Sequence, residues 1–220
     1  GRFTTSSDDL DEQMLNSKAF NTYLGGSQCA DDGILRFVFH AHGGLVSEKS
    51  ALEYARAHRE WWIRNHVYPV FMVWETGFLE TLLGHKRALD GPRLGATDWM
   101  LESSLRAPAA MLWRRMKRNA ERCSAADWQA EVEAEGVQPA DDQAGVVGGA
   151  RLFAQRFARR LVQAGLADGN RMFELHAIGH SAGAIFHAWF LPALRESLAA
   201  EGLAVPLTSL SLLAPAITLE

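Results

Sequence analysis

The sequence predicts an α/β protein with a mostly parallel sheet and flanking helices. Four apolar runs of strand length occur at residues 34–40, 68–74, 172–178 and 207–213. Segments with helical spacing of apolar residues lie between several of them. Nearly continuous apolar strands are typical of a parallel sheet that is covered on both faces. A chain of 220 residues suits one domain, and we expect residues 1–220 to form it.

Composition excludes several classes of function. The chain is 48% hydrophobic and 22% charged, as in ordinary globular proteins. With a net charge of −4, the chain lacks the excess of basic residues that is typical of nucleic-acid-binding proteins. We therefore expect no nucleic-acid partner. Cys29 and Cys123 lack metal-ligand spacing and favour free thiols in a reducing compartment. The first residues do not resemble a signal peptide, and no window resembles a membrane span. These observations predict a cytoplasmic protein.

Residues 1–75 contain two strands and two helical segments. Residues 1–33 are a polar lead with one short helix within 9–23. A helix over 47–65 follows the first strand, and either Ser47 or Ser50 is its N-cap. Four of its apolar residues suit a face packed on the sheet: Leu52, Ala55, Trp62 and Ile63. Glu75 follows the second strand, where it has either a role near a site or a role as a loop or helix cap.

Residues 76–145 interrupt the alternation of strands and helices. Helical patterns near 78–89, 98–105, 109–122 and 125–135 predict a helical cap or lid insertion. Five basic residues lie close together within it: Arg114, Arg115, Lys117, Arg118 and Arg122. A solvated face is the favoured interpretation, and an anionic membrane surface is the alternative. The pattern of residues 145–164 then predicts the helix before the third strand.

The third strand leads into a G-x-S-x-G motif formed by Gly179, Ser181 and Gly183. An apolar strand precedes the motif, and a helix is predicted from 182 to about 200. A strand, a sharp turn and a helix are the context that a nucleophile elbow requires. Ser181 then lies at the tip of the turn, and its small neighbours allow the strand and helix to approach closely.

The end of the first strand carries the second motif. His40, His42, Gly43 and Gly44 lie there, and parallel α/β sheets bind ligands at this edge. Backbone N–H groups of the loop 43–45, together with that of Ala182, can stabilise negative charge that develops on a carbonyl oxygen. His40 and His42 share one side of the strand, but the residues that follow supply no further ligand. We therefore expect no metal.

Together, the two motifs resemble α/β-hydrolase-fold serine hydrolases of the lipase and esterase type, over about residues 34–215. The resemblance implies four parallel strands, with strand 34–40 between its neighbours, and no cofactor. It implies Ser181 as the nucleophile and supporting roles for His42 and His180. The oxyanion hole would consist of Gly43, Gly44, Leu45 and Ala182. The implied substrate is a small-molecule or lipid acyl ester.

The acid and the histidine of a catalytic triad are missing after Ser181. No Asp follows it, and the only histidine, His187, lies inside the predicted helix. We expect the chain to be the N-terminal part of such a hydrolase, completed by a C-terminal segment or a second chain. Alternatively, Glu75 acts with His40 or His176, or the domain is an inactive binding or interaction module. The prediction is an ester hydrolase that forms an acyl-enzyme, and the inactive module is the alternative.

Overall fold

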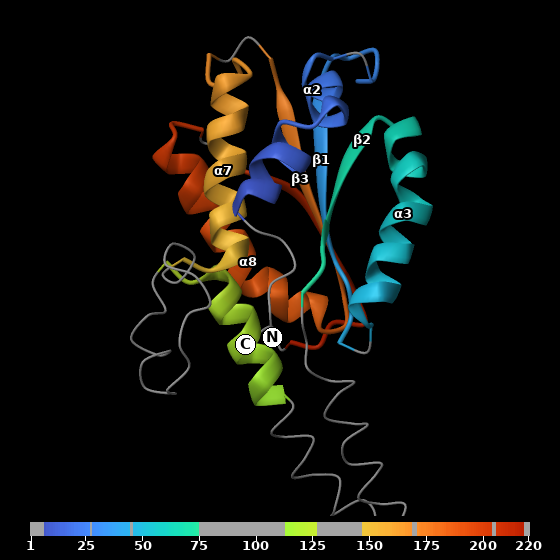
Figure 1. The fold of residues 1–220 in the computed structure, drawn as a ribbon, viewed down its shortest axis with the longest axis vertical. Coiled ribbons are helices and arrows are strands. Elements are labelled where there is room, and N and C mark those ends of the chain that lie inside the picture. The colour runs from blue at the N-terminus through green and yellow to red at the C-terminus, as the bar shows by residue number, and fades with distance from the viewer. Residues whose placement is uncertain are drawn as a thin grey trace, which may run out of the picture.

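Four parallel strands form one sheet in the computed structural model, which describes residues 7–26, 28–44, 46–74, 113–126, 147–168, 171–203 and 206–217 (Figure 1). The strand order is β2-β1-β3-β4. The strands are β1 Leu35–Ala41, β2 Val67–Met72, β3 Phe173–His180 and β4 Leu207–Leu213. Each strand boundary lies within two residues of its prediction. The α/β class and the internal position of the first strand are therefore confirmed.

The register of the strands brings several chain segments to one edge. Ala41 pairs with both Met72 and Gly179, and His180 pairs with Leu213. All four strands therefore end close together. Side chains and loops that follow these ends share a common surface, as expected for the binding edge of a parallel sheet.

Helices cover the two faces of the sheet unequally. α7 (Gly149–Gln163), α8 (Gly183–Ala200) and α2 (Lys18–Leu24) lie on one face, and α3 (Glu48–Arg64) lies on the other (Figure 1). On the first face, Phe37 packs edge-on against Phe157 of α7, with ring centroids 5.2 Å apart. Phe39 packs similarly against Phe190 of α8 at 5.4 Å. These aromatic contacts form the main core.

The N-terminal lead is more broken than the sequence predicts. It contains α1 (Ser7–Asp9), a π-helix η1 (Leu10–Leu15) and α2 instead of one short helix. The Ser17 side chain accepts the Phe20 N–H and begins α2. The Tyr23 hydroxyl accepts the Arg36 N–H at 2.8 Å, and it lies within donating distance of the Arg36 and His66 carbonyls. Burial raises the pKa of Tyr23 to about 12, so its proton remains available for this contact.

The structure of α3 shows which of the two serines, Ser47 or Ser50, is its N-cap. Its N-cap is Ser47, whose side chain accepts the Ser50 N–H at 3.1 Å. The prediction that Leu52 packs on the sheet is wrong, because this side chain is 44% exposed. Ala51 is buried instead. Adjacent helical residues differ by about 100° in direction, which turns Leu52 away when Ala51 faces the sheet.

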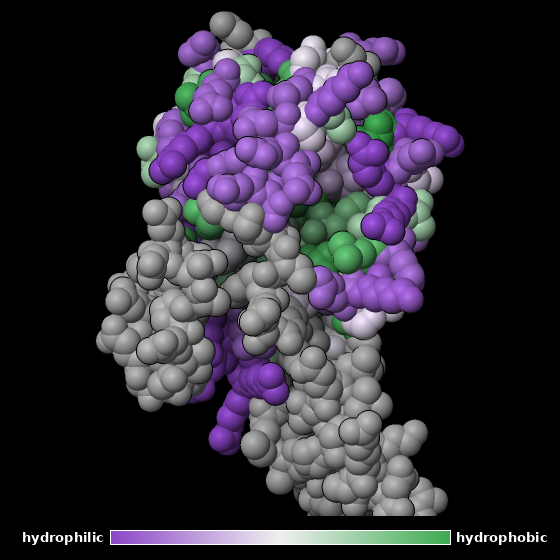
Figure 2. Space-filling model, in the orientation of Figure 1, coloured by the Kyte–Doolittle hydropathy of each residue, from purple (hydrophilic) through white to green (hydrophobic). Residues whose placement is uncertain are grey.

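The strand β4 differs from the other three in its exposure. It is an edge strand, and its seven residues are exposed except for a partly buried Leu212. Leu207, Leu210 and Leu213 all present apolar surface to solvent. Among the described residues, no element packs on the free side of this strand. The face shown in Figure 2 is mainly hydrophilic, with a smaller hydrophobic area near its middle.

Most of the predicted insertion 76–145 lies outside the described residues. The described part, 113–126, is helical over 113–124, and residues 125–126 do not begin the predicted helix 125–135. Met116 and Ala120 attach helix 113–124 to the main core. No described helix is both long enough and apolar enough to cross a membrane.

Candidate active site at the carboxyl edge of the sheet

Ser181 occupies a strained turn between β3 and α8. Its φ is 51°, in the left-handed region that residues other than glycine rarely adopt. The Ser181 N–H donates to the Leu213 carbonyl at 2.9 Å, and the Ser181 carbonyl accepts from Ala184 and Ala216 at 3.0 and 3.1 Å. The turn is therefore held by the first turn of α8 and by the end of β4. Ser181 itself is partly exposed.

The two glycines of the motif are required by close backbone contacts. A Cβ on Gly183 would lie 2.8 Å from the Ala41 carbonyl carbon and 3.1 Å from the His42 oxygen. A Cβ on Gly179 would lie 3.0 Å from both the Ala184 nitrogen and the Gly183 carbonyl carbon. These distances are shorter than ordinary van der Waals contacts. The G-x-S-x-G spacing thus allows α8 to begin directly against the ends of β1 and β3.

The glycine loop after β1 lies against this turn. A Cβ on Gly44 would lie 3.3 Å from the Ala182 Cβ, and one on Gly43 would lie 2.9 Å from His180 Nδ1. Within the described part of the chain, the Ala182 N–H has no hydrogen-bond acceptor. Leu45 lies outside the described residues. The structure therefore brings together Gly43, Gly44, His180 and the Ser181–Ala182 turn, which the two motifs predicted separately.

His42 has a structural role in this loop. It is 8% exposed, its Nδ1 donates to the Gly43 carbonyl at 2.9 Å, and its Nε2 accepts the Trp74 N–H at 3.2 Å. The Trp74 indole N–H donates back to the His42 carbonyl. Burial lowers the pKa of His42, which favours the neutral ring that these bonds require. Both ring nitrogens are engaged, so His42 has none left for a metal or for catalysis.

His40 and His187 have no hydrogen bond to Ser181 in the described structure. His40 is partly buried and stacks on Tyr54 of α3, with ring centroids 5.1 Å apart, and burial lowers its pKa. His187 donates from Nε2 to the Ile178 carbonyl at 2.9 Å, and burial lowers its pKa to about 4. His187 is therefore a packing residue, as its place in the helix predicts. Glu75 lies outside the described residues.

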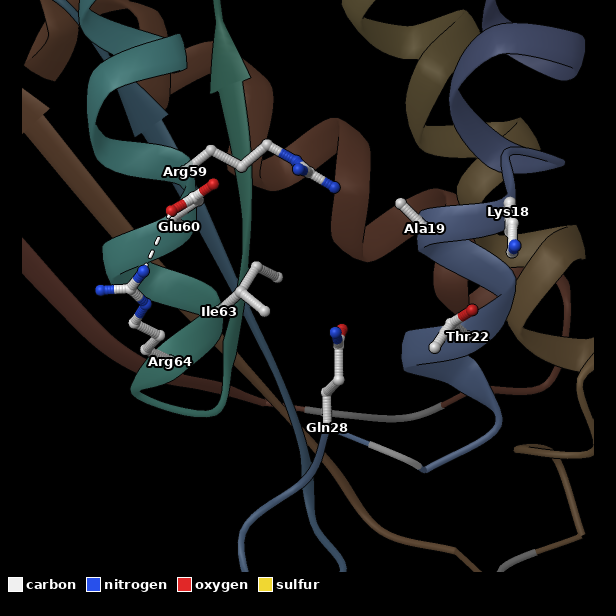
Figure 3. A pocket seen from close by; sticks show the side chains of 8 residues that line it. All are labelled: Lys18, Ala19, Thr22, Gln28, Arg59, Glu60, Ile63 and Arg64. Carbon is white, nitrogen blue, oxygen red and sulfur yellow. Dashed lines mark hydrogen bonds and ion pairs between the residues drawn. The ribbon is translucent and has the colours of Figure 1, made fainter.

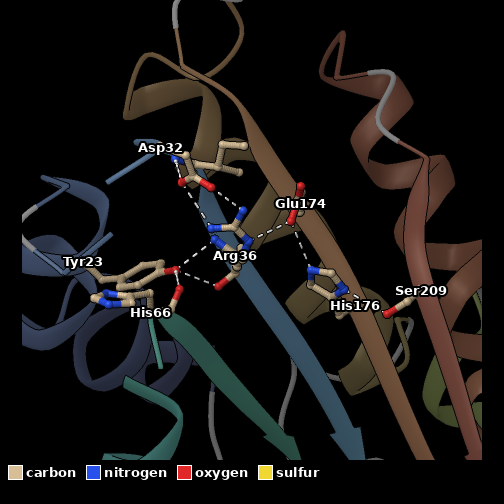
Figure 4. Close-up of polar contacts among 8 residues, drawn as sticks. Tyr23, Asp32, Arg36, His66, Glu174, His176 and Ser209 are labelled. Carbon is tan, nitrogen blue, oxygen red and sulfur yellow. Dashed lines mark hydrogen bonds and ion pairs between the residues drawn. The ribbon is translucent and has the colours of Figure 1, made fainter. Parts of the chain in front are cut away.

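His176 belongs to a separate polar network on the α3 side of the sheet. Its Nδ1 lies 2.8 Å from Ser209 Oγ, and its Nε2 lies 3.4 Å from Glu174, which Arg36 also pairs at 2.9 Å (Figure 4). His176 precedes Ser181 along an extended strand that rises about 3.3 Å per residue. It is too far away to act as a base for Ser181. Among the described residues, the Ser181 hydroxyl thus has no hydrogen-bonded base.

Met116 is a neighbour that the sequence did not reveal. A Cβ on Gly44 would lie 3.0 Å from the Met116 sulfur, so helix 113–124 places an apolar side chain over the glycine loop. A cleft of about 600 Å³ lies elsewhere, between α2 and α3 (Figure 3). Its lining includes Lys18, Arg59 and Ile63 but not Ser181. The strained serine and the adjacent glycine loop therefore remain the best-supported candidate site.

Comparison of the chain with protein-family models, curated proteins and solved structures gives no match. The fold class defined by the structure is α/β, with a four-stranded parallel sheet flanked by helices. The case for a function depends on the geometry of the site itself.

Proposed function

We propose that this protein is a serine hydrolase of the α/β-hydrolase type that cleaves carboxylic esters through an acyl-enzyme on Ser181. The observation that carries the proposal is the positive φ of Ser181 at a strand-to-helix turn, with Gly44 packed against Ala182. Backbone strain at a serine is costly and persists where the surroundings enforce it. An ordinary turn between a strand and a helix requires neither the strain nor the adjacent glycine loop.

In the proposed reaction, Ser181 Oγ attacks the ester carbonyl carbon while a base accepts the hydroxyl proton. The N–H groups of Ala182 and of the Gly43–Gly44 loop stabilise the negative oxygen of the tetrahedral intermediate. The alcohol leaves with a proton, and water then hydrolyses the acyl-enzyme and restores the Ser181 hydroxyl. We infer that a C-terminal segment or a second chain supplies the base and the acid that orients it.

An acyl chain is the substrate group that best suits the surroundings of the loop. Met116, which is buried in the core, places a flexible apolar side chain beside Gly44, and thioether side chains adapt well to apolar ligands. Trp74 also lies close to the loop through its two hydrogen bonds with His42. These contacts support a lipid or another apolar acyl ester as the substrate.

The proposal is tested with a fluorophosphonate probe, which reacts covalently with activated serines. We expect the wild-type protein to be labelled and Ser181→Ala to remain unlabelled. Ser209→Ala is the matched control, because Ser209 is the serine that contacts a histidine in the described structure. Labelling that disappears in Ser209→Ala and persists in Ser181→Ala would contradict the proposal.

The second candidate function is a catalytically inactive binding or interaction module. The absence of a base beside Ser181 among the described residues favours it. The same probe separates the two candidates when it is applied to material from the native source, with any further segment or partner present. Silence of Ser181 in that material would support the inactive module.

A further inference from the structure

Helix 113–124 carries a row of cations beside the candidate active site. Arg114, Arg115, Lys117 and Arg118 are exposed, whereas Met116 and Ala120 are buried in the core. Residues three and four positions apart are neighbours on a helix, so Arg114 lies beside both Lys117 and Arg118. Like charges at these spacings repel one another. Residues 113–124 hold five basic residues and one acidic residue, Glu121. The helix therefore keeps a net positive charge that favours an anionic partner.

The arginines of α7 provide a contrast within the same protein. Arg151 pairs with Glu196, Arg156 with Asp11 and Arg159 with Glu201. Arg160 donates to the Leu15 carbonyl and to the Asn21 side chain.

On helix 113–124, Arg114, Arg115 and Lys117 form no ion pair with any described residue. In a protein of net charge −4, this group of cations is left for a partner outside the described structure.

Trp113 indicates the chemistry of that partner. It is 41% exposed and lies one helical turn before Lys117. An exposed tryptophan next to basic residues suits the headgroup region of a bilayer. The apolar face of this helix is already buried against the protein core, so the contact would involve headgroups and not deep insertion.

Helix 113–124 lies between its exposed cations and the candidate active site at Ser181. Met116 reaches the Gly44 loop from the buried face, and the exposed cations occupy the outer part. Trp113 lies three positions before Met116, on the side of the helix that faces the core, and is exposed in the first described turn. Figure 1 shows the helix in yellow-green below α8, towards the end of the sheet where the strands terminate. In Figure 2, hydrophilic side chains project at that position. A flat anionic surface bound here would lie close to the carboxyl edge of the sheet.

We propose that Trp113, Arg114, Arg115 and Lys117 form a docking surface for an anionic phospholipid bilayer. A nucleic acid is the less suitable partner, because the exposed Trp113 suits the headgroup region of a bilayer and the arginines of α7 are engaged within the protein. The proposal goes beyond ester hydrolysis and does not require it. If both proposals hold, the substrate is an ester that resides in such a bilayer.

The test is co-sedimentation of the full chain with vesicles made of equal parts phosphatidylcholine and phosphatidylglycerol. The Ser181→Ala background is used, so that hydrolysis does not affect the measurement and failure of the hydrolase proposal leaves this test intact. The charge variant is R114Q/R115Q/K117Q, and K18Q/R56Q/R59Q is the control with the same change in net charge. Basic residues at an anionic surface each contribute a factor of about five. We expect roughly 100-fold weaker binding for the charge variant and near-parental binding for the control.

Binding should also weaken as salt is added, and vesicles of phosphatidylcholine alone should bind poorly. Equal loss in the two variants would overturn the proposal, since net charge alone would then explain it. Equal binding to neutral vesicles would overturn it as well. So would binding of the unmodified surface to duplex DNA without binding to vesicles.

Discussion

The sharpest test of the strand-to-helix turn is Gly183→Ala. The added Cβ would come closest to the Ala41 carbonyl oxygen and would lie 2.8 Å from the Ala41 carbonyl carbon, roughly 0.7 Å closer than the ~3.5 Å at which carbon atoms pack. Ala41 ends the central strand β1, so relief requires α8 to move away from the sheet. We expect a loss of about 1–3 kcal/mol in the free energy of unfolding, as for other overpacked cores.

The same displacement should reach the proposed nucleophile, because Ser181 lies two residues before the start of α8. A shift of about 1 Å at a catalytic group can reduce rates by roughly 100-fold. Fluorophosphonate labelling kinetics measure this effect, and urea denaturation measures the stability. Gly149→Ala is the matched control, since a Cβ there meets nothing within 4 Å. This control should leave labelling unchanged and cost no stability. Wild-type labelling and stability in Gly183→Ala would refute the close-packing argument.

Three further predictions concern Ser181, His42 and His187. Ser181→Gly should be about 1 kcal/mol more stable to urea than Ser181→Ala, because glycine tolerates a φ of 51°; equal stability would argue against strain. His42→Leu should lose about 1–3 kcal/mol, since it leaves the Trp74 N–H without its buried acceptor. Urea denaturation measures this loss of stability, and probe labelling of Ser181 should become slower. An unchanged labelling rate would refute the role of His42 in the loop. For His187, burial lowers the pKa from 6.5 to about 4, so the unfolded chain binds a proton before the folded chain does. Stability is therefore fully present above pH ~6.5 and falls by up to about 3 kcal/mol as the pH drops to ~4. Denaturation of His187→Gln across this range should show a flatter pH profile, and a profile identical to wild type would refute the assignment.

The strands were predictable because their apolar runs are continuous and bounded by turn residues. The strand β4 shows the limit of that argument. The pattern of Leu207–Leu213 identifies a strand, but hydrophobicity alone does not reveal that Leu207 and Leu213 are exposed at the sheet edge. Exposure depends on what else packs there, which is information outside the strand itself.

The strand-to-helix turn at Ser181 was predictable because the motif places glycines where the backbone leaves no room for a Cβ. Gly179, Ser181 and Gly183 identify the turn because only small residues permit those contacts. The partners that come from distant segments were not predictable. Met116 reaches Gly44 from helix 113–124, and Trp74 reaches His42 from the segment after β2. Neither contact leaves a periodic or local signal in the sequence.

The hydrogen bond from the Ser181 N–H to the Leu213 carbonyl gives the edge strand β4 a second role. The Leu213 carbonyl of β4 holds the backbone amide of Ser181, the proposed nucleophile. The other edge of β4, which pairs with no strand in the described structure, faces solvent. Fraying of this strand would release the serine amide, and a strand paired along that edge would hold it more firmly. The rigidity of the Ser181 turn therefore depends on the edge strand of the sheet.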